Sequence, residues 1–171
     1  MQSSISALTF RASRGSRALE NFQLKSQNLR KMKKKVCEGR ISSQFGERIH
    51  PVTRAKSFHS GVDIAAPVGT PVHTPVDAYI AQVYDHAIGG KTIVLKDVLS
   101  GDRYGFCHLS RQLVTAGKTV PKGTIIAASG NTGRSTGPHL HFSYATRGKW
   151  IGGNCTGFIY QNPVQKIEFE V

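Results

Sequence analysis

The 171-residue sequence contains no apolar run close to the roughly 18 residues that a membrane-spanning helix needs. Its three cysteines, Cys37, Cys107 and Cys155, are odd in number and widely spaced, so they form neither a disulfide framework nor a CxxC metal site. We expect free thiols. With 39% hydrophobic residues and 18 glycines, the chain is not of a disordered or collagen-like type. Its length fits one domain that buries a core without disulfides.

Acidic residues are scarce: 10 Asp and Glu stand against 23 Lys and Arg, which gives a net charge of +13. Residues 1–40 contain ten of the basic residues and only two acids, so they carry +8, and the rest of the chain carries +5. We therefore divide the chain into a basic N-terminal arm, residues 1–38, and a domain, residues 39–171. The charge suits an anionic polymer, a membrane surface or nucleic acid. The arm has no Trp and no nucleic-acid-binding motif, so no nucleic-acid partner is expected.

Within the arm, apolar residues recur near helical spacing and predict an amphipathic helix over residues 17–36, with a cationic opposite side. Two interpretations remain open. The helix docks its apolar stripe on its own domain or on a second copy, or it anchors the protein to an anionic surface or a partner. No clear signal peptide precedes it, because Ile5–Phe10 is short and broken and follows no basic segment.

From residue 40 onward, short β-type runs alternate with Gly, Pro, Asn and Asp turns, which predicts an all-β domain. The expected strands are Gly39–Gln44, Pro71–Ala81, Lys91–Lys96, Asp102–His108, Thr124–Ser129, His139–Ala145 and Val164–Val171. A short helix is expected around Ser110–Thr115.

Two histidine patterns in this domain suggest a metal site. His59 and Asp63 are four residues apart, a spacing that places both on one face of a helical turn or of an extended strand. His139 and His141 flank Leu140, so on a strand both point to the same side. Either pattern alone is weak, because single histidines are more often structural. Taken together, they offer several nitrogen and oxygen donors to one cation.

Two histidines and one aspartate match the donor set of a catalytic zinc ion, with one position left for water. A hydrolase also needs groups that deprotonate water and stabilise an oxyanion, and further histidines suit both tasks. No HExxH motif supplies a glutamate base. The remaining candidates have ordinary interpretations: His50, His73 and His86 are expected in structural or surface positions, and Cys107 as a small core residue.

Five segments, in this order, resemble the lysostaphin-type (LytM-like) zinc endopeptidases, which cleave peptidoglycan peptides. They are Ile41–Thr53, Phe58–Val72, Cys107–Ser110, Ser129–Phe142 and Asn162–Pro163. The resemblance covers about residues 40–165. It implies a central antiparallel sheet with loops that wall a narrow groove, where Gly-rich stretches such as residues 130–137 let backbone approach an extended peptide. It also implies one zinc ion bound by His59, Asp63 and His141.

The same resemblance implies that His108 and His139 form the catalytic pair, and it leaves open which is the general base. The sequence departs from the family at Ile88–Thr92, at Phe106 and at Ser143, which puts the groove wall and the substrate preference in doubt. The scissile bond is either Gly–Gly or one between D-Ala and a diamino acid. A non-catalytic wall-binding or activator module of the same fold is the alternative function.

The resemblance implies action at the bacterial cell wall. A single catalytic domain without a clear signal peptide or wall-targeting repeat favours a virion-associated phage lysin whose basic arm contacts virion or tail proteins. A periplasmic or extracellular bacterial enzyme is the alternative.

Overall fold

The computed structural model of the protein describes residues 36–49, 54–147, 150–151, 154–155 and 157–166. The predicted helix of the arm therefore lies outside the described residues, except for Val36, which is buried together with Cys37 in the core of the domain. The boundary between arm and domain stays a prediction. No helix among the described residues is long and apolar enough to cross a membrane.

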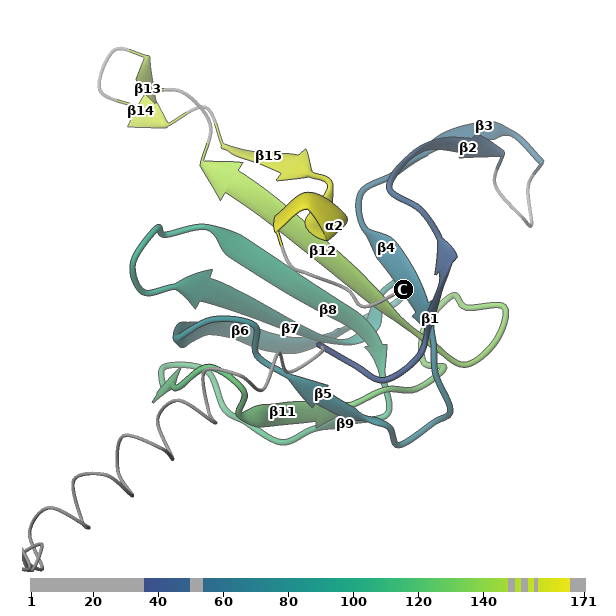
Figure 1. The fold of residues 1–171 in the computed structure, drawn as a ribbon, viewed down its shortest axis with the longest axis horizontal. Helices are drawn as coiled ribbons and strands as arrows, with labels where there is room; N and C mark the ends of the chain where they lie inside the picture. The colour runs from purple at the N-terminus through teal and green to yellow at the C-terminus, as the bar shows by residue number, and fades with distance from the viewer. Residues whose placement is uncertain (1–35, 50–53, 148–149, 152–153, 156, 167–171) are drawn as a thin grey trace, which may run out of the picture. The chain divides into compact units, whose positions relative to one another are not determined.

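One eight-stranded antiparallel sheet forms the framework of the domain (Figure 1). Its strand order is β1 (Arg40–Ser43), β4 (Val62–Ala65), β12 (His139–Arg147), β8 (Arg103–Leu109), β7 (Gly90–Asp97), β6 (Ala78–His86) and β10 (Thr119–Val120). The eighth strand, β15 (Phe158–Gln161), pairs with the second half of β12, whereas β4 pairs with the first half. The predicted all-β class is confirmed.

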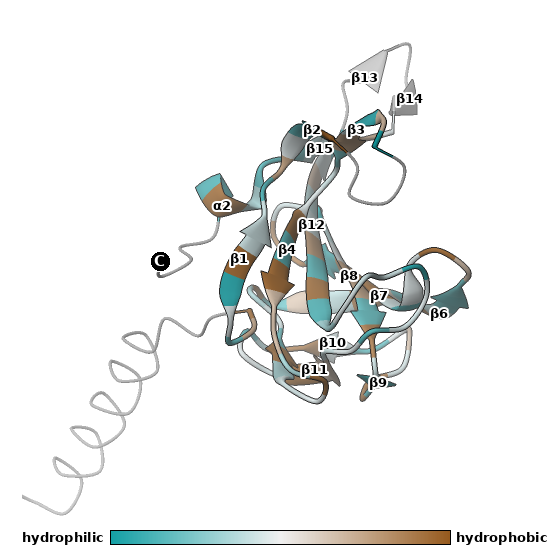
Figure 2. Ribbon diagram, turned by 90° about the vertical axis from the view of Figure 1, so that its right-hand side faces the viewer, coloured by the Kyte–Doolittle hydropathy of each residue, from teal (hydrophilic) through white to brown (hydrophobic). Residues whose placement is uncertain are grey.

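Apolar and polar residues alternate along the central strands and separate the two faces of this sheet (Figure 2). Leu140, Phe142 and Tyr144 on β12 are buried, whereas His141 and Ser143, which alternate with them, are half-buried on the opposite face. Tyr104 stacks between Phe142 and Tyr144, with ring centroids 6.2 and 5.2 Å away. Such pairs add roughly 0.5–1.5 kcal/mol each beyond burial. The core therefore holds β12 firmly, with its polar face turned outward.

Three smaller sheets complete the domain. One consists of β5 (Pro71–His73), β11 (Ile125–Ala128) and β9 (Arg111–Gln112) and contributes Val72 and Ile126 to the core. The second is the hairpin of β2 (Gly46–Ile49) and β3 (Lys56–His59), which extends from the main sheet (Figure 1). The third pairs β13 (Trp150–Ile151) with β14 (Asn154–Cys155).

Three expected elements differ from the structure. The run Pro71–Ala81 is divided into β5 and β6, because Pro75 lacks a donor and the Thr74 hydroxyl bonds the backbone of Val76 instead.

The strand expected at Val164–Val171 begins as a short helix, α2 (Pro163–Lys166). The side chain of Asn162 accepts a hydrogen bond from the Val164 amide, and Pro163 occupies the first helical position.

The helix expected at Ser110–Thr115 is absent from these described residues, and Arg111–Gln112 pair with Ala127 and Ala128 as β9. The side chain of Gln112 donates to the carbonyls of Tyr84 and Thr92, which secures this segment against the main sheet.

Candidate metal centre

Asp63 and His141 are brought together by strand pairing. They are direct partners across β4 and β12, and both lie on the face of the sheet opposite the buried Val62 and Phe142. Directly paired residues of antiparallel strands lie about 4.5–5.5 Å apart at Cβ. The sheet thus places a carboxylate beside an imidazole before any ion is bound.

His59, at the end of β3, completes a group of three donor atoms. Its Nε2 lies 3.1 Å from Asp63 Oδ1 and 3.0 Å from His141 Nδ1, and His141 Nδ1 lies 2.9 Å from the same Oδ1. These three residues are a group able to hold a metal ion. The sequence patterns placed His59 and Asp63 in one motif and His141 in another, and the fold unites them.

The orientation of His59 is determined by its other ring nitrogen. Nδ1 lies 2.7 Å from the carbonyl oxygen of Gln44, and because a carbonyl only accepts, Nδ1 must carry the proton. Nε2 then presents a lone pair to Asp63 Oδ1, which is also an acceptor. A shared cation, either a metal ion or a second proton on the imidazole, would hold these two atoms 3.1 Å apart.

The charge state of Asp63 also suits a cation. Burial by itself would raise the pKa of this carboxyl, but the hydrogen bonds with His141 and His59 outweigh burial and hold the pKa well below its usual range. The carboxylate therefore stays ionised at neutral pH. Only 14% of its side chain is exposed, so water screens this charge little.

The three donor atoms fit zinc in chemistry and in spacing. Zinc–nitrogen and zinc–oxygen bonds of 2.0–2.2 Å in a tetrahedron require ligand atoms about 3.3 Å apart, close to the separations found here. Nitrogen and carboxylate donors are those that zinc prefers, whereas calcium and magnesium prefer oxygen donors alone.

Gly61 makes room for this arrangement. A Cβ at this position would lie 2.4 Å from the carbonyl oxygen of Phe142 and 2.9 Å from Nε2 of His141. Real Cβ atoms do not approach backbone this closely, so any larger residue would displace β12 or the His141 ring.

His139 lies beside the donor group. Its Nδ1 donates to the carbonyl oxygen of Gly137 at 2.8 Å and is 3.2 Å from the Ser135 hydroxyl. Its Nε2 is thereby left with a lone pair, 3.7 Å from Asp63 Oδ1. The predicted strand geometry, with His139 and His141 on one face, is confirmed.

His108 reaches the same place by an unusual backbone conformation. Its φ is +61°, in the left-handed region, and its Nδ1 donates to the carbonyl oxygen of Thr132 at 2.8 Å. Its ring centroid lies 4.6 Å from that of His139. Burial lowers the pKa of His108, although the bond to Thr132 opposes this change. A low pKa keeps the ring neutral near pH 7, with a lone pair on Nε2.

The structure also corrects the expectation that Cys107 is a small core residue. Cys107 pairs directly with His141 on β12 and lies on the face opposite the buried Phe106, so strand alternation points it into the cavity that contains the histidines. His108 lines the same cavity because its left-handed backbone interrupts the alternation. Burial raises the pKa of the Cys107 thiol. Cys37 and Cys107 are both free thiols, and the side chain of Cys155 lies outside the described residues.

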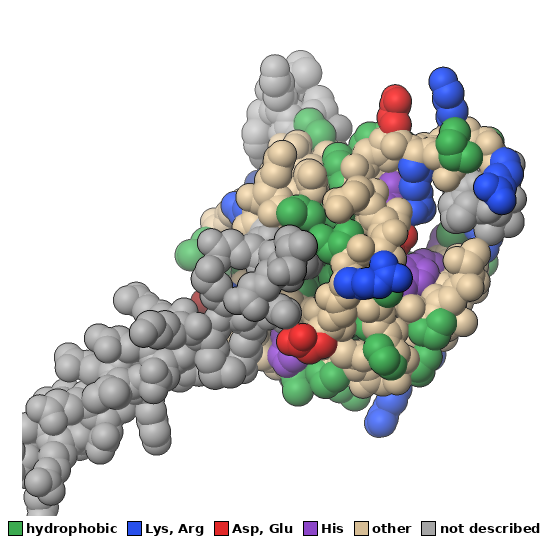
Figure 3. Space-filling view, turned by 45° about the vertical axis from the view of Figure 1, so that its right-hand side comes forward, with side chains coloured by type: hydrophobic (Ala, Val, Ile, Leu, Met, Phe, Trp, Pro, Cys, Tyr) green, Lys and Arg blue, Asp and Glu red, His purple; other side chains and the backbone are tan. Residues whose placement is uncertain are grey.

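The cavity has a volume of about 470 Å³ and contains all five histidine and aspartate candidates. In the space-filling view, histidine side chains lie in a hollow whose rim carries Lys and Arg side chains (Figure 3). Ile88 and Gly89, from the segment that departs from the family pattern, form part of the wall. The segment expected to alter a groove wall therefore does line the cavity, and its effect on substrate preference stays a prediction.

Arg48 is a site residue that the sequence patterns missed. Its Nη1 lies 3.3 Å from Asp63 Oδ2 and also donates to the hydroxyl of Ser43. The residue lies inside the segment Ile41–Thr53, which carried the resemblance, but no spacing rule connects it with Asp63. Only the folding of the β2–β3 hairpin against β4 reveals this contact.

Other histidines have structural surroundings. His86 is exposed, and its Nδ1 accepts hydrogen bonds from the amides of Ile88 and Gly89, which closes a turn. His73 is half-buried on β5, and His50 lies outside the described residues.

The glycines of loop 130–137 have different surroundings. A Cβ at Gly133 would lie 2.3 Å from the Gly90 amide nitrogen, so this glycine packs against the protein's own backbone, whereas a Cβ at Gly137 would meet nothing within 4 Å. The expected contact of this loop with an extended peptide stays a prediction.

Comparison with known proteins agrees with this geometry. The model of peptidase family M23 matches residues 57–152, which include every candidate ligand and both further histidines. The chain belongs to peptidase family M23. The predicted lysostaphin-type relationship is thereby confirmed.

Related proteins of this family act on peptidoglycan by name. The chain is 43% identical over 132 residues to peptidoglycan DD-endopeptidase ShyA of Vibrio cholerae, and the aligned region covers 75% of this chain and 30% of the relative. It is 38% identical over 110 residues to DD-carboxypeptidase/endopeptidase Mpg of Neisseria meningitidis, spanning 64% and 25%. The chain thus spans less than a third of the length of these relatives.

Solved structures share the fold. The catalytic domain of lysostaphin from Staphylococcus simulans superposes with a TM-score of 0.63 at 29% identity, covering 75% of this chain and 91% of that domain. A zinc-containing peptidase from Vibrio cholerae superposes with a TM-score of 0.58 at 39% identity, covering 62% and 33%.

Proposed function

We propose that this M23 domain is a zinc-dependent endopeptidase that hydrolyses peptide bonds of bacterial peptidoglycan. One observation carries the proposal: His59 Nε2, Asp63 Oδ1 and His141 Nδ1 lie within 3.1 Å of one another, beside two further histidines in the same cavity. Relatives named as DD-endopeptidases support the D-Ala–diamino acid cross-link as substrate, in preference to Gly–Gly.

In this proposal His59, Asp63 and His141 hold the ion. A zinc ion bound there would supply Lewis acidity toward the scissile carbonyl and lower the pKa of the attacking water. The protein supplies the fixed orientation of the donors. Because Gln44 holds the ring of His59 and the strand pair holds Asp63 against His141, little conformational entropy is lost on metal binding.

His139 and His108 would handle the protons. With Nδ1 of each ring bonded to a backbone carbonyl, each Nε2 is free to accept a proton. We assign His139 as the base for the attacking water, because its Nε2 lies beside the donor group, 3.7 Å from Asp63 Oδ1. His108 would take up this proton at its Nε2 from His139, whose ring centroid lies 4.6 Å away, and its lowered pKa would make it a ready donor of the same proton to the leaving amine.

The test is digestion of purified sacculi with and without a zinc chelator, followed by mass spectrometry of the newly formed amine ends. Hydrolysis that stops with the chelator and returns with added zinc supports the proposal. Zinc-loaded protein that opens no peptide bond contradicts it. The alternative, a non-catalytic wall-binding module, would be favoured by two results together: the unaltered chain hydrolyses nothing, and the His108→Ala variant still binds the wall.

The setting in which the protein meets the wall is a further part of the proposal. A virion-associated lysin and a periplasmic or extracellular bacterial enzyme would both use this site. Mass-spectrometric detection in purified virions, or in the periplasmic fraction of uninfected cells, separates the two.

A further inference from the structure

The histidine cavity carries positive charge that the proposed hydrolysis does not use. Arg48 and Arg134 both line it, and among its described lining residues the single acid is Asp63. The carboxylate of Asp63 would be neutralised by a bound dication. Both guanidinium groups would then face the substrate without a compensating negative charge. A cavity of this kind attracts an anionic group.

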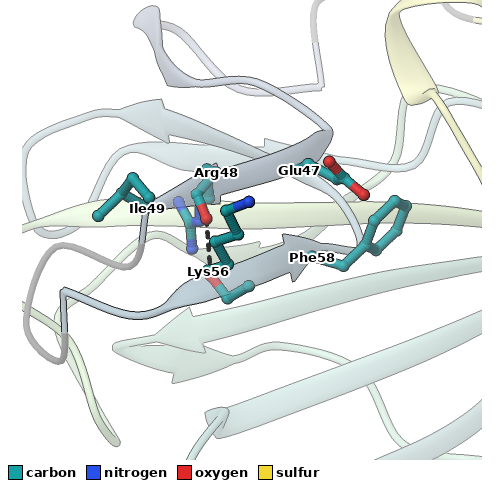
Figure 4. A pocket seen from close by; sticks show the side chains of 6 residues that line it. Glu47, Arg48, Ile49, Lys56 and Phe58 are labelled. Carbon is teal, nitrogen blue, oxygen red and sulfur yellow. Dashed lines mark hydrogen bonds between the residues drawn. The ribbon is translucent and has the colours of Figure 1, made fainter.

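Arg48 comes from the β2–β3 hairpin. It pairs with Ser57 across the hairpin, and both residues line the cavity that contains the histidines. Figure 4 shows Arg48 on this hairpin together with Glu47, Ile49, Lys56 and Phe58. The side chain of Arg48 is 28% exposed. Its Nη1 is engaged by Asp63 and Ser43, but its Nε is buried without a hydrogen-bond partner among the described residues. A buried donor without a partner indicates a group that a ligand could satisfy.

Arg134 comes from the segment between β11 and β12. Its amide donates to the carbonyl of Ile88 at 2.9 Å, which ties this segment to another part of the cavity wall. Its side chain is exposed and forms no ion pair with the described residues. The charge of Arg134 is therefore available to a ligand, whereas that of Arg48 is shared with Asp63.

We propose that Arg48 and Arg134 form a carboxylate subsite that recognises the leaving side of the scissile amide. This inference rests on the proposed function and deepens it. In a cross-link between D-Ala and a diamino dicarboxylic acid, which has an amine and a carboxylate at each end, the carbon that bears the scissile nitrogen also bears a carboxylate. That group lies within two bonds of the reacting atoms, and it would enter the same cavity as the scissile carbonyl. A Gly–Gly cross-bridge has no such charge.

The chemistry of guanidinium groups suits this role. Arginine binds carboxylates through two parallel hydrogen bonds, and such charged bonds contribute about 1.5–3 kcal/mol each. For a single bond, that range corresponds to a preference of about 10- to 150-fold for the carboxylate over a neutral substrate, because about 1.4 kcal/mol is tenfold in affinity. Bound here, the carboxylate would also fix the position of the leaving nitrogen relative to His108 and His139.

The test compares two cross-linked dimers that differ only in this carboxylate, one with the free acid and one with the amide. For the zinc-loaded full chain, we expect kcat/KM for the acid to exceed that for the amide by 10-fold or more. Arg134→Gln should bring this ratio close to one. Arg111→Gln, which removes an equal charge from exposed strand β9 outside the cavity, should keep the ratio of the unaltered protein.

Binding provides a second measurement that does not depend on turnover. The dissociation constants of both dimers for zinc-loaded His108→Ala should show the same preference for the acid. Equal cleavage and equal binding of acid and amide would overturn the subsite but leave the peptidase intact. A preference that survives in Arg134→Gln would also overturn it. Absence of hydrolysis of either dimer would contradict the proposed function, and the binding ratio would still decide the subsite.

Discussion

Arg48 contacts one oxygen of the Asp63 carboxylate and leaves the other oxygen to the histidines. Nη1 of Arg48 lies 3.3 Å from Oδ2, while Oδ1 lies 3.1 Å from His59 and 2.9 Å from His141. The guanidinium thus holds the oxygen that faces away from the histidines and directs the other into the donor group. A partner of this kind outside the ligand set commonly controls metal affinity.

Arg48→Lys is expected to weaken zinc affinity about 10-fold, within the range known for such partners. Lysine keeps the positive charge, so electrostatic repulsion of the ion changes little, but its single ammonium does not reproduce the planar fork. Competition with a chromogenic chelator measures the affinity. Arg111→Lys on β9 is the matched control. Equal affinities for the two variants would show that Arg48 does not orient Asp63.

Gly61→Ala is expected to lower both zinc affinity and stability. The added Cβ would meet the Phe142 carbonyl at 2.4 Å and His141 Nε2 at 2.9 Å, so β12 or the His141 ring must move. We expect a loss of about 1–3 kcal/mol of unfolding free energy, as for other overpacked sites. Gly137→Ala is the control for both measurements, because a Cβ there meets nothing within 4 Å. Urea unfolding and zinc titration of both variants check this, and equal losses would contradict it.

Exchange of His108 or His139 for alanine is expected to separate catalysis from metal binding. Neither residue belongs to the three-residue donor group, so both variants should keep one zinc per chain. Loss of a positioned acid or base should reduce kcat by about 10²- to 10⁴-fold. His141→Ala should instead lose the zinc itself. Zinc content and hydrolysis rates, measured on the same samples, provide the comparison. Full activity of His108→Ala would remove that residue from the mechanism.

Ionisation of Tyr144 is expected to make the protein less stable at alkaline pH. Burial and a 2.8 Å hydrogen bond to Asp102 raise the pKa of Tyr144 from 10.0 to about 12. A raised folded-state pKa contributes stability that is fully present below pH 10 and is lost as pH rises toward 12. The whole contribution is about 2–3 kcal/mol at 1.36 kcal/mol per pKa unit.

The variant Tyr144→Phe isolates this effect. It should be less stable than the unaltered protein at pH 8, because Asp102 loses a buried hydrogen-bond donor. Between pH 10 and 12 the difference should shrink. Unfolding free energies from urea titrations at pH 8, 10 and 11 measure both. A difference that stays constant over this range would show that Tyr144 does not ionise as expected.

Much of the candidate site could be predicted from local patterns. The alternation of His139, Leu140 and His141 predicts two histidines on one strand face, and the burial of Leu140 between them agrees. The spacing of His59 and Asp63 predicts a shared cation, and their 3.1 Å separation agrees. The first rule works because strand geometry sets the direction of alternate side chains. The second pair is close for another reason than the one expected: His59 ends β3 and Asp63 lies on β4, and the bend at residues 60 and 61 between these strands brings them together.

Two predicted elements were wrong, because each depends on a specific hydrogen-bonding partner that the residue pattern does not show. The segment expected to be a helix at Ser110–Thr115 became β9, because its partner β11 lies across the smaller sheet. The strand expected from Val164 starts as a helix, because the Asn162 side chain caps it. Local propensity did not reveal either partner, since pairing and capping are decided where segments meet.

The sequence by itself determined the all-β class, the chemical identity of the donors and the faces on which His139 and His141 lie. These follow from residue type and a two-residue period. Tertiary structure alone decided that Asp63 and His141 are strand partners, that Arg48 holds Asp63, and that His108 enters the cavity. The register of β4 against β12, the fold of the β2–β3 hairpin and the left-handed backbone at His108 are set by packing across the whole domain. A site built from four separate segments takes form only when those segments pack together.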